Sequence, residues 1–217
     1  MSFYPSVMRL PVALLLTLVA GGCVRRAAPA PAPATLASNG PRALSVYRAI
    51  AESVYVRTTN RVVAVAATTL DTTCSAATCV PLAARWGMET VWWGSDHTEG
   101  AVDARNDLLA RAGEVVTIGA AAAGHPLLFE ADPGDVPPAG AGSAEWNRFR
   151  ATHADASGIV RMSPVGFSRS GRTAVAFVDW RCGPTCGHRL GVVLAAASDT
   201  SWMITDMLLV SSDQRQR

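Results

Sequence analysis

Apolar residues first recur regularly after residues 39–41, Asn-Gly-Pro, a sequence that favours the start of a helix with proline in its first turn. The apolar positions that follow are spaced by three and four residues, which places them on one helix face. They are Leu44, Tyr47, Ala51, Val54 and Tyr55. We therefore expect a helix over residues 41–57. Further helices are expected at residues 100–112 and after Ser143, and short strands at residues 62–69, 115–118 and 127–130.

Four strand-like runs dominate the last third of the chain, at residues 159–167, 173–180, 189–197 and 202–210. Short polar or glycine-containing connections separate them. Such connections join antiparallel neighbours, because a parallel crossover needs a dozen or more residues. The fold class that we predict is α+β, with N-terminal helices packed on an antiparallel sheet that ends in a four-strand C-terminal meander.

The amino terminus has the three parts of a secretory signal. A short segment with one arginine precedes an apolar run from Leu10 to Ala20, and small residues then lead to Cys23. The apolar run is shorter than the roughly 20 residues that a helix needs to cross a bilayer. A retained transmembrane anchor is therefore disfavoured, and export with removal of the signal is expected.

The residues directly before Cys23, Ala-Gly-Gly at positions 20–22, resemble the lipobox of bacterial lipoproteins. The resemblance implies that Cys23 becomes the first residue of the mature protein and carries acyl chains such as palmitate. Val24 and Arg25 follow the cysteine in place of aspartate, which in this family implies an anchor in the outer membrane, facing the periplasm. A plain signal peptide, cut after a small residue, is the alternative.

Residues 24–40 are rich in alternating alanine and proline and have no apolar periodicity. This composition favours extended polyproline II at ~3.1 Å per residue, so the segment reaches on the order of 50 Å. We interpret it as a stalk between the lipid and a folded domain. The chain thus divides into a lipoprotein signal peptide at residues 1–22, an Ala/Pro-rich stalk at residues 23–40 and a single α+β soluble domain at residues 41–217.

Charge and composition exclude several classes of function. The chain has 19 basic side chains, all of them arginine, against 17 acidic ones, and its net charge of +2 is too small for a nucleic-acid surface. Because lysine is absent, Schiff-base and lysine-nucleophile chemistry are excluded. The sequence contains no glycine-rich phosphate motif and no paired metal histidines, so we expect no cofactor and no metal.

Five cysteines become four once Cys23 is assigned to lipid, and an even number in an exported protein indicates disulfides. The four, Cys74, Cys79, Cys182 and Cys186, can pair in three ways. We favour the two local pairs, because each of them closes a short turn.

The sequence AVAFVDWRCGPTC resembles the strand and the CGPC site of thioredoxins. Here three residues separate the cysteines rather than two, and residues 187–194 read as a strand where the redox fold needs a helix. Catalytic thiol chemistry is therefore disfavoured. Metal binding by Cys182, Cys186 and His188 is disfavoured as well, because thiols in an oxidising compartment are usually paired.

A further resemblance covers about residues 127–211. Its motifs, in order, are Trp146-x-x-Phe149, Ser157-Gly158-Ile159, SPVGFSRSG, Ala174-Val175, CGPTCG, Val193-Leu194 and Trp202-x-Ile204. The set is similar to a pattern in a group of uncharacterised exported bacterial proteins with a CG-x-x-CG-type cysteine motif, from which this chain departs at Pro164 and Ser168. The resemblance implies a shared fold unit and no particular activity.

Candidate binding residues are few: Trp93, His97, Trp146, His153 and Asp206. On a regular strand, Asp206 shares a face with Trp202, Ile204 and Leu208. If that face is buried, the carboxylate needs a partner, and Arg181 or Arg189 would suit it.

Catalytic patterns are weaker. His97 lies between Asp96 and Glu99 in a polar loop, where adjacent residues seldom orient one another for acid–base work. Residues 166–170, Gly-Phe-Ser-Arg-Ser, nearly fit the nucleophile elbow of hydrolases, but a hairpin turn explains them better. The sequence predicts no catalytic residue.

The function that these observations favour is a lipid-anchored cell-envelope protein with a non-catalytic binding or interaction domain. Its partners would be the membrane, through the lipid at Cys23, and an unknown envelope protein or a small ligand. A periplasmic enzyme, either a hydrolase or a thiol oxidoreductase, is the alternative.

Overall fold

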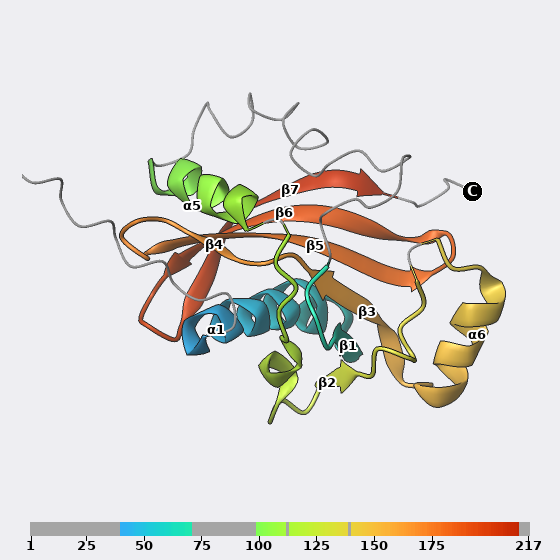
Figure 1. Ribbon diagram of the computed structural model, residues 1–217. Coiled ribbons are helices and arrows are strands. Elements are labelled where there is room, and N and C mark those ends of the chain that lie inside the picture. The colour runs from blue at the N-terminus through green and yellow to red at the C-terminus, as the bar shows by residue number, and fades with distance from the viewer. Residues whose placement is uncertain (1–39, 71–98, 112, 139, 213–217) are drawn as a thin grey trace, which may run out of the picture. The chain divides into compact units, whose positions relative to one another are not determined.

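A seven-stranded mixed sheet with helices on both faces forms the centre of the fold (Figure 1). The computed structural model describes residues 40–70, 99–111, 113–138 and 140–212. The strands are β1 (Val62–Ala66), β2 (Leu128–Ala131), β3 (Ala156–Met162), β4 (Gly166–Phe167), β5 (Thr173–Gly183), β6 (Cys186–Ala196) and β7 (Trp202–Ser212). Their order across the sheet is β2-β1-β3-β5-β6-β7, and β4 pairs with β5.

The helices confirm the α+β class. They are α1 (Pro41–Ile50), the π-helix η1 (Ala51–Val56), α2 (Arg57–Thr59), α5 (Glu99–Ala110), the 3-10 helix η2 (Gly119–Ala122) and α6 (Ser143–Thr152). The first three follow one another without a break, where the apolar stripe predicts one helix. Asn60, with a φ of 50°, ends this helical segment in the left-handed conformation that asparagine tolerates.

The expectation of an antiparallel sheet is wrong for the N-terminal strands. β1 pairs in parallel with β2 on one side and with β3 on the other. The connections explain this, because α5 and η2 lie between β1 and β2, and α6 lies between β2 and β3. Both connections therefore provide the long crossover that parallel strands need.

The four-strand meander is not formed as predicted, because the run 159–167 splits into two strands. β3 ends at Met162 and β4 begins at Gly166, and both pair with β5. Pro164 lies between them and has no N–H group to donate to a strand neighbour. The pairs β5–β6 and β6–β7 are antiparallel. The predicted strand at 115–118 reduces to a single bridge between Thr68 and Thr117.

The two sheet faces have separate apolar cores. On one face, α1 and η1 bury Tyr47, Ile50 and Tyr55 against the sheet. On the other, α5 packs Leu108 against Phe177, and Figure 1 shows α1 and α5 on opposite sides of the strands. α6 adds a third cluster beside β1 and β3.

α5 approaches β4 unusually closely. A Cβ atom added at Gly166 would lie 2.0 Å from the Ala104 carbonyl oxygen and 2.4 Å from the Leu108 nitrogen. Only glycine allows two backbones to come this near. The Gly166 position therefore fixes α5 on the sheet.

Candidate binding pocket

A pocket of about 350 Å³ lies at the carboxyl ends of the parallel strands. Because β2, β1 and β3 run in the same direction, their carboxyl ends meet at one edge of the sheet. The pocket is lined by residues 66–70, at the end of β1 and just after it, by Val115, by Pro133, Val136, Pro137 and Pro138 after β2, and by Arg161 of β3.

The strand order explains why a hollow forms there. From β1 the chain passes to β2 on one side of β1, and β2 then leads to β3 on the other side. Where the connections of neighbouring parallel strands leave in opposite directions, a crevice remains outside their carboxyl ends. The fold therefore places a pocket between the segments that follow β1 and β2.

Among the described residues of the pocket wall, Arg161 is the charged one. Its side chain is only 8% exposed. One terminal nitrogen, Nη2, donates a hydrogen bond to the Pro137 carbonyl oxygen, and Nη1 lies 3.8 Å from Oδ2 of Asp179. Burial lowers the pKa of the guanidinium, Asp179 opposes this shift, and nearby Arg181 and Arg189 add to it. The protein thus holds a cation in a poorly hydrated place.

Asp179 forms an ion pair with Arg161 from the neighbouring strand. On the sheet it lies directly between Arg161 of β3 and Arg189 of β6. Its Oδ1 accepts a hydrogen bond from Nε of Arg181 at 2.8 Å and one from Nε of Arg189 at 3.4 Å. The carboxylate is 7% exposed. Because Asp179 serves all three guanidinium groups, it does not neutralise Arg161 alone.

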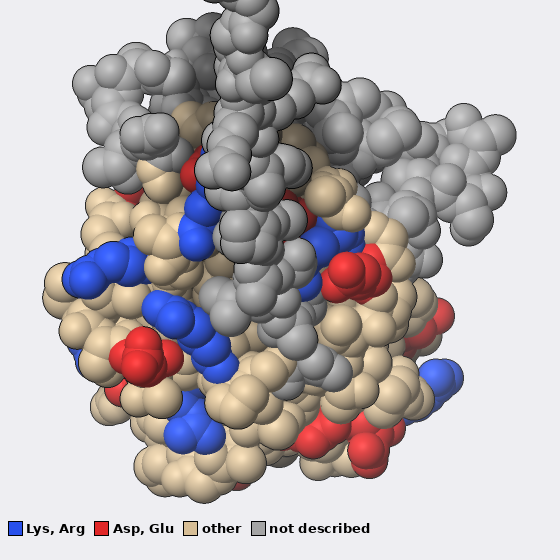
Figure 2. Space-filling view, turned by 60° about the vertical axis from the view of Figure 1, so that its left-hand side comes forward, with Lys and Arg blue, Asp and Glu red and all other residues tan. Residues whose placement is uncertain are grey.

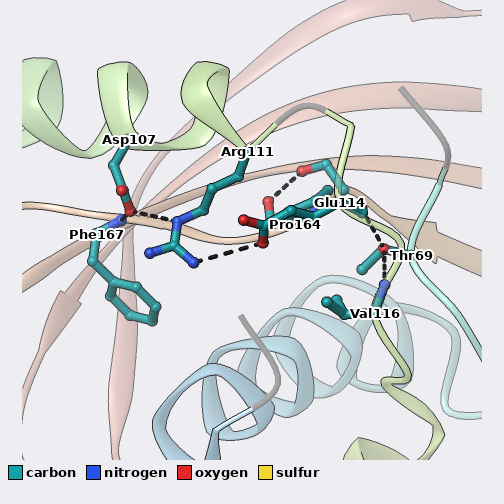
Figure 3. Close-up of polar contacts among 8 residues, drawn as sticks. Thr69, Asp107, Arg111, Glu114, Val116, Pro164 and Phe167 are labelled. Atoms are coloured by element: carbon teal, nitrogen blue, oxygen red, sulfur yellow. Dashed lines mark hydrogen bonds and ion pairs between the residues drawn. The ribbon is translucent and has the colours of Figure 1, made fainter. Parts of the chain in front are cut away.

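Backbone and hydroxyl contacts fix one wall of the pocket, as Figure 3 shows. The Thr69 hydroxyl donates to the carbonyl oxygen of Glu114 at 3.3 Å and accepts the N–H of Val116 at 3.0 Å. The N–H of Thr69 also donates to the carbonyl oxygen of Val116, at 2.9 Å. Three contacts therefore join the segment after β1 to the segment that carries Val115.

An ion-pair network around the buried Arg111 ties this wall to α5 and β4 (Figure 3). Nε of Arg111 donates to Oδ2 of Asp107 at 3.1 Å, and Nη1 lies 3.7 Å from the Glu114 carboxylate. The same Asp107 oxygen accepts the N–H of Phe167 at 2.9 Å. Burial raises the pKa of the nearby Tyr47 phenol, so this group stays neutral. The network supports the pocket without lining it.

A second hollow of about 310 Å³, lined by Arg42, Arg172, Asp199 and residues 196–198, is a weaker candidate. Arg42 already donates to the Gly171 carbonyl oxygen at 2.6 Å, lies over the Trp202 ring and pairs with Asp199 at 3.7 Å. The Arg42 guanidinium is therefore already engaged in contacts within the protein. On the face seen in Figure 2, arginine and acidic side chains are interspersed.

His153 and Trp146 have structural roles and do not line the pocket. Trp146 is buried in the apolar cluster between α6 and the sheet, where it packs edge-on against Phe149. The His153 ring contacts the rings of Phe129 and Phe149 at a tilt, with centroid distances of 4.9 and 5.0 Å, and its Nε2 lies 3.2 Å from Oδ2 of Asp135. Asp135 belongs to the proline-rich segment of the pocket wall. His153 therefore holds that segment from behind and does not line the pocket.

The expected environment of Asp206 is wrong, because β7 contains a bulge. Ile204 pairs with Leu194 and Asp206 with Val193. Since adjacent residues of β6 face opposite sides of the sheet, Ile204 and Asp206 do so too. Asp206 accepts the N–H of Met207 at 2.7 Å. The carboxylate that pairs with Arg181 and Arg189 is Asp179.

Cys182 and Cys186 form a disulfide that closes the end of the β5–β6 hairpin, as predicted, with Cα atoms 5.1 Å apart. The neighbouring His188 ring stacks on Tyr55, with ring centroids 5.8 Å apart, and contacts Trp180 at a tilt, with centroids 5.0 Å apart. Within the described ranges, no group of three histidine, cysteine or acidic side chains could hold a metal ion.

Ser168 lies in the turn that joins β4 to β5. Its hydroxyl accepts the N–H of Thr173 at 3.1 Å and lies 3.1 Å from the Ser170 hydroxyl. Gly171 completes the turn with a φ of 68°. The hairpin interpretation of this sequence is confirmed.

The remaining predicted site residues, Cys23, Cys74, Cys79, Trp93 and His97, lie outside the described residues. Arg161, the charged group of the pocket, is absent from the sequence-based candidates. The sequence does contain an indication of its importance. Arg161 is the one charged residue in the apolar run 159–167, and a charge buried in such a run requires a partner or a ligand.

No protein-family model, curated protein or solved structure matches this chain. None of the helices in the described part of the chain is long and apolar enough to cross a membrane.

Proposed function

We propose that this protein is a lipid-anchored cell-envelope protein whose α+β domain binds a small molecule, without catalysis, in the pocket at the carboxyl ends of β1, β2 and β3. The lipobox-like sequence before Cys23 supports the anchor, with residues 1–22 as its signal peptide and residues 23–40 as its stalk. Absence of aspartate after Cys23 supports the outer membrane, facing the periplasm.

The observation that carries the binding function is the pocket itself. Its volume of about 350 Å³ falls in the range of small-molecule sites, which are mostly apolar with a few polar groups that orient the ligand. Here proline, valine and leucine side chains provide the apolar walls, and Arg161 and Thr68 provide polar groups. The hydrogen bonds of Thr69 hold one wall in place before any ligand arrives.

A fragment screen by NMR tests this function. Charged and neutral fragments are added to the isotope-labelled mature protein, and we expect the hits to shift the amide signals of Thr68, Leu70 and Val136. Thr68→Trp places a large side chain at an exposed pocket position and should abolish these shifts. Thr200→Trp, at an exposed position outside the pocket lining, is the matched control. Hits that shift only signals outside the pocket, or that still shift the pocket signals in Thr68→Trp, would refute the proposal.

The anchor is tested separately by mass spectrometry of the mature amino terminus. We expect an acylated Cys23 as the first residue of the membrane-associated protein. Cys23→Ser should release the protein from the membrane fraction. An unmodified Cys23 in that fraction would contradict the anchor and leave the binding function standing.

A further inference from the structure

We propose that the ligand of this pocket is a small carboxylic acid, whose carboxylate pairs with Arg161 and whose apolar body lies against the proline-rich wall. This inference rests on the proposed function of the pocket and adds the chemical class of its ligand. Three features of the site support it: the free donor capacity of Arg161, the charge of its cluster and the apolar lining.

Arg161 has hydrogen-bonding capacity beyond what the protein uses. A guanidinium carries five N–H donors in a planar fork that matches the two oxygens of a carboxylate. The described contacts of Arg161 are one hydrogen bond, to the Pro137 carbonyl oxygen, and one ion pair, with Asp179 at 3.8 Å. The side chain is more than nine-tenths buried, so few of its rotamers remain to be lost on binding.

The charges around Arg161 favour an anion. Asp179, which does not line the pocket, is shared with Arg181 and Arg189. Burial and the neighbouring cations already disfavour the charged form of Arg161, as its lowered pKa indicates. A carboxylate placed against Arg161 would offset both effects, whereas a neutral ligand would offset neither.

The rest of the lining selects for an apolar body and a single charge. Leu70, Val115, Pro133 and Val136 contribute apolar surface, and among the lining residues that the structure describes Arg161 is the only charged one. A dianionic phosphate or a dicarboxylate would leave a second negative charge without a cation in an apolar hollow. A monocarboxylate satisfies the guanidinium and leaves no buried charge unpaired.

Benzoate and benzamide are suitable probes, because they have nearly the same shape and differ in charge. Both are titrated by calorimetry into the full mature protein at pH 7, with succinate and inorganic phosphate as further probes. We expect benzoate to bind at least about tenfold more tightly than benzamide, since charge-assisted hydrogen bonds are roughly twice as strong as neutral ones. Succinate and phosphate should bind more weakly than benzoate.

Two arginine variants separate pairing in the pocket from general charge. Arg161→Met should lose the preference for benzoate, and Arg161→Lys should retain part of it. Arg189→Met is the matched control, because Arg189 contacts the same Asp179 and does not line the pocket. It should change benzoate affinity by less than about threefold. If Arg161→Met does not fold, the ratio of benzoate affinity to benzamide affinity in the wild-type protein still tests whether the pocket prefers a carboxylate.

Each outcome has a defined meaning. Equal binding of benzoate and benzamide, or a preference that persists in Arg161→Met, would overturn the carboxylate assignment while the proposed binding function stands. Tighter binding of phosphate or succinate would overturn it too. If neither benzoate nor benzamide binds but neutral fragments do, the ligand class is wrong. If no fragment reaches the pocket, the proposed function itself fails.

Discussion

The substitution Asp179→Asn tests how strongly one carboxylate stabilises the cluster of Arg161, Arg181 and Arg189. The asparagine amide keeps the shape of the carboxylate and can still accept a hydrogen bond from Arg181, but it removes the negative charge that Arg161, Arg181 and Arg189 share. Arg161, at 8% exposure, would then have only the Pro137 carbonyl oxygen as a partner in the described structure.

The size of the effect follows from the burial of the three arginines. Breaking a buried ion pair typically costs 3–5 kcal/mol. Arg181 and Arg189 are 17% and 34% exposed and can regain water more readily than Arg161, which is 8% exposed. We therefore expect a loss at the low end of that range, about 3 kcal/mol, which corresponds to roughly 6–12 °C in melting temperature for a domain of this size.

Urea denaturation followed by circular dichroism measures this loss. Asp199→Asn is the matched control, because its carboxylate is 95% exposed and pairs with Arg42 at 3.7 Å, so its removal should not shift the midpoint measurably. The double variant with Arg161→Met should lose less stability than the sum of the single variants, by at least about 1 kcal/mol. Equal stabilities of Asp179→Asn and the wild type would show that the Asp179 charge does not stabilise the arginine cluster.

Three further changes probe other parts of the fold. Gly166→Ala should cost at least about 2 kcal/mol in urea denaturation, because its Cβ would meet the backbone of α5, whereas Gly134→Ala, with nothing within 4 Å, should be neutral; equal effects would contradict the close approach. Burial lowers the pKa of His188 below its usual 6.5 despite nearby Asp179, so the unfolded chain binds the proton first as the pH falls. The stability gained from a neutral His188 is therefore present above pH 6.5 and lost as the pH falls towards the folded-state pKa; His188→Gln should lose less stability than the wild type between pH 7 and 5, and parallel pH profiles would rule this out. Replacing Cys182 and Cys186 together by serine should cost about 2 kcal/mol, since the disulfide closes only a short loop, and an unchanged melting temperature would show that the bond does not stabilise the hairpin.

Local patterns predicted much of the secondary structure. The apolar stripe around Tyr47 and Tyr55 identified the first helical segment, because one helix face is buried over its whole length. The π-helix within it was not predicted, since its wider turn leaves no spacing signal in a single sequence. Short connections correctly indicated the antiparallel pairing of β5, β6 and β7.

Long-range pairing was the part that local patterns could not supply. The parallel register of β1 with β3, which pairs Ala64 with Ile159, depends on contacts between segments far apart in the chain. Without it, the sequence alone does not indicate that Pro133 and Val136, in the segment after β2, form a pocket wall. The bulge in β7 likewise reverses the face of Asp206, because one extra residue changes a strand's alternation.

A crystal structure of the mature protein with benzoate would show whether the pocket binds a carboxylate through Arg161. We expect benzoate in the pocket at the carboxyl ends of β1 and β2, with its carboxylate oxygens within hydrogen-bonding distance of the Arg161 guanidinium and its ring against Pro133 and Val136. Benzoate bound elsewhere, or bound in this pocket with its carboxylate turned away from Arg161, would contradict this expectation.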